Sequence, residues 1–177
     1  THNKEHGIRF FYSDRNTITQ NTITNTSNYD IYFYGSSNNT IKGNTIKYNN
    51  HSGIGFSTSK NNIIVGNTII HNNGYGMQLM YSQVNTITEN TITNHTRRGI
   101  SFGCSRNNKI YHNNFINNVQ HASSDMRESA WGNGYPGGGN YWNDYNGTDN
   151  YHGTYQDMSG CDGIGDTPRT IPIYSEN

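Results

Sequence analysis

The sequence predicts an all-β protein, a single-stranded parallel β-helix (solenoid) of about five 23-residue coils with an irregular C-terminal cap. First, Asn, Ser and large apolar residues each recur at a step of 23 residues. Second, the apolar residues stand alone or alternate with polar ones over three positions, which is strand periodicity. Such a coil cannot bury its own apolar side, but stacked coils form continuous inner columns of Ile and Phe.

Several series of residues keep this step without an insertion. They are Asn16, Asn39, Asn62, Asn85 and Asn108; Asn21, Asn44, Asn67, Asn90 and Asn113; Ser13, Ser36, Ser59, Ser82 and Ser105; and four apolar columns that begin at Ile8, Phe10, Ile18 and Ile23. A corner between strands needs residues that tolerate left-handed backbone angles and form local hydrogen bonds, and Asn does both. We therefore expect the Asn columns to mark the corners, with their amide side chains stacked in ladders.

The composition suits one domain and argues against a membrane-spanning or nucleic-acid-binding protein. The chain has 177 residues, of which 30% are hydrophobic, 14% are charged and 30 are Asn. So polar a chain would normally be disordered, but 14 Tyr, 6 Phe and a strict repeat oppose that interpretation. No apolar run reaches the length of a membrane-spanning helix, and no polybasic tail indicates a nucleic-acid partner.

The zero net charge combines two unlike parts of the chain. Residues 1–122, the predicted coils, begin partway through a coil and hold ten Lys or Arg against four Asp or Glu. Residues 123–177 lose the period, are rich in Gly, Tyr, Trp and Asp, and hold two basic residues against eight acidic ones. We expect this acidic segment to cap a mildly basic rod.

The repeated N-x-I-x-x-N-x-I motif, followed by GNYWNDY at 139–145 and DGIGDTP at 162–168, resembles the NosD-like proteins. These belong to the carbohydrate-binding and sugar-hydrolase (CASH) class of right-handed parallel β-helices, which is abundant among secreted archaeal surface proteins. The resemblance covers nearly the whole chain and implies an extracellular or cell-surface location. Relatives include copper-site accessory proteins and polysaccharide lyases, hydrolases and epimerases, so the resemblance does not fix an activity.

The resemblance also implies an ion site in the tail. In the family, the segment before the DGIGD run supplies alternating oxygen ligands, as Ca²⁺ loops do. The candidate Ca²⁺ ligands here are Asp157, Asp162, Asp166 and the carbonyl of Ile164. The acidic positions expected upstream hold a Met and a Gly, so the loop departs from the pattern. The alternative is that these Asp and Gly residues only form turns that cap the rod.

Aromatic residues predict a stripe that contacts carbohydrate. Exposed rings in neighbouring columns can stack on sugar rings. The candidate ligand-binding residues are Tyr12, Tyr34 and Tyr81, flanked by Phe11 and Met80, with a separate pair, Tyr29 and Tyr75, in another column. The alternative is that the aromatic residues of the tail fold back and cover the stripe.

We expect an extracellular module that is structural or contacts a polysaccharide, and that assembles end to end into a sheath, layer or filament. A chain that starts mid-coil would leave a sheet edge and an open core, so upstream coils of a longer parent or another subunit are the expected partners. The acids of the coils occupy four different columns, so no catalytic residue is assigned. They are Glu5, Asp14, Asp30 and Glu89.

Two alternatives stay open. One is a polysaccharide-active enzyme whose site combines tail acids with basic residues of the coils: Asp125, Glu128 or Asp144 against Arg97, Arg98 and Arg106. The other is a copper-handling role, although His51, His71, His95, His112 and His121 fall in five different columns. If the tail packs on the fifth coil, Cys104 and Cys161 would form a disulfide, as an extracellular setting permits.

Overall fold

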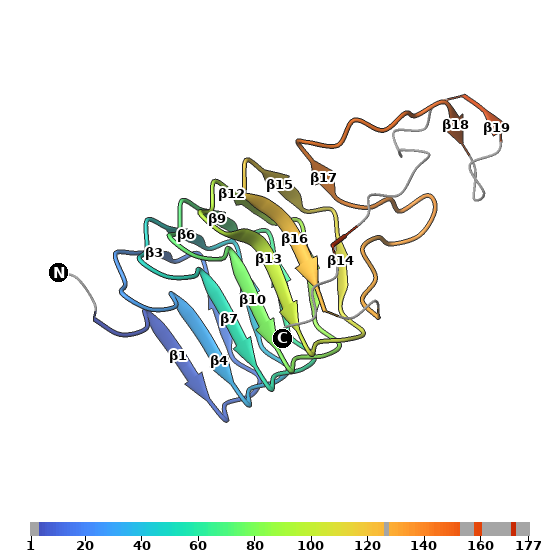
Figure 1. Cartoon of the computed structure of the whole chain (residues 1–177). Helices are drawn as coiled ribbons and strands as arrows, with labels where there is room; N and C mark the ends of the chain where they lie inside the picture. The colour runs from blue at the N-terminus through green and yellow to red at the C-terminus, as the bar shows by residue number, and fades with distance from the viewer. Residues whose placement is uncertain (1–3, 126–127, 153–157, 161–170, 173–177) are drawn as a thin grey trace.

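The computed structural model describes residues 4–125, 128–152, 158–160 and 171–172, and in them the chain forms a parallel β-solenoid of about six turns without a helix (Figure 1). Three sheets run along it. The first contains β1 (Ile8–Phe11), β4 (Ile31–Tyr34), β7 (Ile54–Ser57), β10 (Met77–Met80), β13 (Arg98–Gly103) and β16 (Gln120–Ser124). The second contains β2 (Thr17–Thr19), β5 (Thr40–Lys42), β8 (Ile63–Val65), β11 (Thr86–Thr88) and β14 (Lys109–Tyr111).

The third sheet contains β3 (Thr22–Thr24), β6 (Thr45–Lys47), β9 (Thr68–Ile70), β12 (Thr91–Thr93), β15 (Asn114–Ile116) and β17 (Tyr141–Trp142). Each of the first five coils thus supplies one strand to each sheet, coil 1 being β1 to β3 and coil 5 being β13 to β15, and the sixth turn supplies β16 and β17. A short antiparallel hairpin, β18 (Tyr151–His152) and β19 (Met158–Ser159), extends beyond the end of the solenoid (Figure 1).

Strand register confirms the predicted columns. Ile31 pairs with Ile54 in the first sheet, and Ile41 pairs with Ile64 in the second. The solenoid has a sixth turn beyond the expected five, because Ala122 pairs with Ile100 and Trp142 pairs with Phe115 after the sequence period is lost. This turn is therefore built from residues on both sides of position 122.

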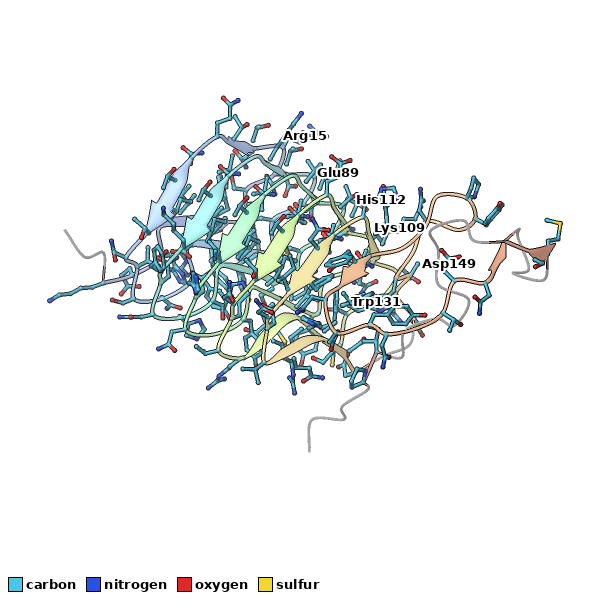
Figure 2. The ribbon with its side chains drawn as sticks, turned by 90° about the horizontal axis from the view of Figure 1, so that it is seen from above. Arg15, Glu89, Lys109, His112, Trp131 and Asp149 are labelled. Carbon is cyan, nitrogen blue, oxygen red and sulfur yellow. The ribbon has the colours of Figure 1, made fainter. Side chains whose placement is uncertain are left out.

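The core consists of the four predicted columns. From coil 2 to coil 5 their members are at most 3% exposed, and the rings of Phe10, Phe33 and Phe56 stack at 4.9 and 5.0 Å between centroids. At the C-terminal end Trp142 stacks on Phe115 at 4.4 Å. Trp131 lies at the same end (Figure 2) and contacts Phe102 edge-on. The tryptophans of the tail therefore close the core.

Side-chain ladders join the coils at every corner. In both Asn columns, Oδ1 accepts the backbone N–H of the equivalent Asn one coil earlier, as from Asn39 to Asn62 and from Asn44 to Asn67, both at 2.9 Å. The Ser column does the same through Oγ at 3.0 to 3.1 Å. The predicted amide ladders are thus confirmed. A further ladder that the sequence did not reveal consists of Thr26, Asn49, Asn72, His95 and Asn118.

The left-handed backbone conformation falls one residue before each ladder position. Arg15, Asn38 and Val84 precede ladder residues and have φ between 56° and 61°. Successive corners follow one another along the rod, as Glu89 and His112 do in Figure 2. The expectation that the ladder Asn residues themselves adopt this conformation was wrong. They are selected because their side chains replace missing backbone acceptors, whereas the preceding residue makes the bend.

Two ionisable side chains are buried at the additional ladder. Burial lowers the pKa of His95 to about 4; its Nδ1 accepts the Asn72 N–H, and its Nε2 donates to the Ile69 carbonyl at 3.1 Å, so the neutral ring replaces an Asn amide. Asp30 stands in the column that holds Gly53 and Gly76, and burial raises the pKa of its carboxyl to about 8.

Removing one ladder amide should destabilise the fold. Asn67→Ala leaves the buried N–H of Asn44 without its acceptor, and we expect the free energy of unfolding to fall by about 3 kcal/mol. Asn50→Ala, at an exposed position outside the ladders, is the control and should change it by less than about 0.5 kcal/mol. Urea denaturation of both variants measures the difference, and equal losses would contradict the role of the ladder.

A β-branched residue is poorly suited to a corner. Val84 has φ 56° and a 51% exposed side chain. The change in backbone strain should therefore dominate the effect of a substitution there on the free energy of unfolding. Val84→Asn should raise the free energy of unfolding by about 1 kcal/mol. The reverse change one coil earlier, Asn61→Val, should lower it by a similar amount, as measured by thermal denaturation. A loss of stability in Val84→Asn would refute this account.

Asp30 should make stability depend on pH. Because its pKa is raised on folding, its contribution is fully present below about pH 4 and is lost as pH rises toward 8. We expect Asp30→Asn to raise the free energy of unfolding at pH 8 by about 3 kcal/mol or more, and by much less at pH 4. His95 has the opposite dependence between pH 6.5 and 4 in both proteins, so the difference isolates Asp30. Parallel pH profiles would refute the prediction.

Candidate functional site

The outer face of the first sheet carries aromatic side chains over its first two coils. Along each strand, residues that point outward alternate with those that enter the core. The outward residues of β1 and β4 are Arg9, Phe11, Tyr32 and Tyr34. The equivalent positions of β7 are Gly55 and Ser57, and those of β13 are Ser101 and Gly103. The wide aromatic surface is therefore confined to one end of this face.

Phe11, Tyr12 and Tyr34 form a cluster of rings that we call the aromatic platform. Phe11 and Tyr34 stack at 5.1 Å, and Tyr12 packs edge-on against them at 4.5 and 5.5 Å. Tyr12 also covers Gly35, where a Cβ atom would lie 2.6 Å from its ring. Phe11 is 55% exposed and Tyr12 is 67% exposed, so the platform faces solvent. The Arg9 guanidinium lies 5.6 Å from the Phe11 ring centre.

The structure brings together two of the three predicted ligand-binding residues. Tyr12 and Tyr34 share the platform, whereas Tyr81 lies three coils further along the Tyr12 column, past Gly35 and Thr58. Tyr81 is 58% exposed and has no ring contact within the described part of the chain. Trp131 and Trp142 of the tail pack at the opposite end of the solenoid, so these two rings do not cover the platform.

A second aromatic group borders the same face at the start of the strands. His6 stacks on Tyr32 at 4.9 Å, Tyr32 stacks on Tyr29 at 5.1 Å, and His51 meets Tyr29 edge-on. Tyr29 covers Gly55, where a Cβ would lie 2.6 Å from the ring, and its hydroxyl donates to Oε1 of Gln78. Burial raises the pKa of Tyr29 to about 12, so this phenol is neutral.

A cavity of about 290 Å³ continues this border toward the last coils. It is lined by Tyr75, Thr96, Arg97, Arg98, Val119 and Gln120. The Arg97 guanidinium lies 5.7 Å from the Tyr75 ring centre, and Nε of Arg98 donates to Oε1 of Gln120 at 2.9 Å. The cavity was not predicted from the sequence. Both arginines were considered there only as partners of acids in the tail.

Those acids make other contacts in the last turns of the solenoid. Asp144 pairs with Nε2 of His121 at 3.1 Å, and Asp125 accepts the backbone N–H of Cys104. Glu128 contributes its backbone oxygen to the Asn107 N–H at 3.0 Å. The described contacts of these residues thus stabilise the end of the rod.

The predicted Ca²⁺ site lies outside the described residues, as do all four candidates, Asp157, Asp162, Ile164 and Asp166. Cys161, the proposed partner of Cys104, also lies outside them. Within the described ranges, no group of three or more His, Cys, Asp or Glu could hold a metal ion. The same ranges contain no helix that is long and apolar enough to cross a membrane.

Comparisons with known proteins agree with the architecture. The sequence model of the family described as "Periplasmic copper-binding protein (NosD)" matches residues 1–147. Among solved structures, the periplasmic alginate epimerase AlgG is similar with a TM-score of 0.66 and 21% identity, over 72% of this chain and 35% of the epimerase. A point mutant of AlgG gives a TM-score of 0.65 and 20% identity, over 71% and 34% of the two chains.

The chain therefore spans about a third of the epimerase that it resembles. At this level of identity, the likeness establishes the shared solenoid fold and no activity. A search of curated proteins gives no match. Since the family model covers most of the sequence, this chain belongs to the NosD family of parallel β-helix proteins.

Proposed function

We propose that this solenoid works outside the cytoplasm as a carbohydrate-contacting module, and that it binds a polysaccharide along the outer face of the first sheet. The aromatic platform carries this proposal. Two exposed rings, Phe11 and Tyr12, pack with the half-buried ring of Tyr34 on the first sheet, and exposed aromatic faces are the surfaces on which sugar rings stack.

Contacts within the protein hold the platform in place. The ring centroids lie 4.5 to 5.5 Å apart, and Gly35 leaves room for Tyr12 to lie against the backbone. Binding therefore costs little side-chain entropy, which favours affinity for a repetitive and weakly polar surface such as a sugar face. A single exposed apolar residue is common on protein surfaces, whereas a contiguous exposed cluster indicates an interaction site.

Two comparisons support a location outside the cytoplasm and a polysaccharide ligand. The AlgG structure bears the name of a periplasmic enzyme that acts on alginate, a polysaccharide, and the family description is also periplasmic. A polymer that follows a solenoid contacts equivalent positions about every 4.8 Å, the spacing of neighbouring strands. The face that carries the platform continues over all six strands of the first sheet (Figure 1), so it offers a long surface for a chain molecule.

Affinity electrophoresis against a panel of neutral and acidic polysaccharides tests the proposal. We expect the Tyr12→Ala, Tyr34→Ala double variant to bind its polysaccharide about tenfold more weakly, because two ring contacts are worth about 1–3 kcal/mol. Tyr141→Ala is the matched control, since Tyr141 is 59% exposed but lies on β17 of the third sheet, away from the proposed binding face. Failure of the wild type to bind any member, or unchanged binding by the double variant, would overturn the proposal.

A further inference from the structure

We infer that the cavity beside Arg97 is an anion subsite, which takes a carboxylate carried by an acidic sugar of the bound polymer. The inference rests on the proposed function and adds the chemical class of the ligand. The aromatic platform by itself does not distinguish a neutral polysaccharide from an acidic one, whereas a pair of arginines does.

The lining of the cavity fits a sugar acid. Arg97 and Arg98 supply guanidinium donors, and Gln120 and Thr96 add an amide and a hydroxyl. Tyr75 and Val119, which is 78% exposed, give apolar surface on which the carbon face of a sugar can lie. A few polar groups placed among apolar walls are the usual composition of a site for a small polar molecule.

Neighbouring residues hold both arginines in place. The Arg97 guanidinium lies over the Tyr75 ring, and the backbone N–H of Tyr75 is in turn fixed by Oγ of Ser52 at 3.1 Å. Nε of Arg98 donates to Gln120 in the next coil. Ordered guanidinium groups recognise a carboxylate better than mobile ones because less side-chain entropy is lost on binding.

The electrostatic environment favours an anion. Within the described ranges Arg97 makes no ion pair, and its charge reaches the next aromatic group: burial chiefly lowers the pKa of His51, with further lowering by the charges of Arg97 and His6. Residues 1–122 as a whole hold ten basic against four acidic residues. A carboxylate would therefore be attracted, at long range by this field and at short range by the Arg97 guanidinium.

The cavity lies on the same sheet as the aromatic platform but at the start of its strands, whereas the platform lies at their end. Tyr29 and Tyr75 occupy the same column two coils apart, which corresponds to a separation of about 10 Å along the solenoid. The second aromatic group and the cavity thus lie in line on one border of the first sheet. A polysaccharide parallel to the axis along this border would contact Tyr29 and Tyr75 and reach both arginines at the start of coil 5.

Matched polymers that differ only in charge test the inference. We expect polygalacturonate to bind at least tenfold more tightly than its fully methyl-esterified form, with affinity that weakens as salt is raised. Arg97→Gln should reduce affinity for polygalacturonate about tenfold and leave the esterified polymer unaffected. Arg106→Gln is the control, because Arg106 is exposed and bonds to Gln83 outside the cavity. Thermal denaturation confirms that each variant is folded.

The outcomes separate this inference from the proposed function. If both polymers bind equally and Arg97→Gln has no effect, the anion subsite is refuted and the aromatic platform stands. If neither polymer binds and no polysaccharide of the electrophoresis panel binds, the proposed function is refuted as well. Titration with monomeric galacturonate identifies the source of the carboxylate. Binding of the monomer as tight as that of the polymer would overturn a polymer subsite.

Discussion

The structure depends on one hydrogen bond that is repeated at every corner. A side-chain oxygen of Asn or Ser accepts the backbone N–H of the residue one coil earlier, as Asn62 does for Asn39 and Ser59 does for Ser36. Strands of three to six residues do not supply the hydrogen bonds that the chain needs where it bends, and a buried N–H without an acceptor is costly. The ladders carry the hydrogen bonding around the corners and fix the 23-residue register.

This interaction separates the residues that specify the fold from those that are free to vary. In coils 2 to 5 the side chains of the Ser and Asn ladders point inward and are buried, whereas the residue before each of them has positive φ and lies on the outside of the corner. That second position holds Tyr12, Val84 or His112 in different coils. The corners can therefore carry any surface chemistry that tolerates the left-handed conformation, and Tyr12 of the platform is one result.

Much of the fold could be predicted from the sequence because one-to-one stacking turns a period into contacts. The columns that begin at Ile18 and Asn16 were found in this way, as was the proximity of Tyr12 to Tyr34. The further ladder was not predicted because Thr26 and His95 interrupt its Asn residues. Its members share a hydrogen-bonding role and not a residue type. The sixth turn escaped because its pairing continues while its spacing changes. The Arg97 cavity depends on side-chain conformations across coils, which no column describes.

Departures from the repeat create the functional surface. A perfect repeat would give identical outer positions on every coil and no defined site. Here a large side chain is accommodated where an adjacent coil has glycine: Tyr12 over Gly35, Tyr29 over Gly55, and Met80 over Gly103. A Cβ at any of these glycines would lie within 2.6 Å of the ring or thioether, so the large side chain would have to move. Such paired departures locate the aromatic groups on one sheet, and they are the sequence signal by which similar surfaces can be found in other solenoids.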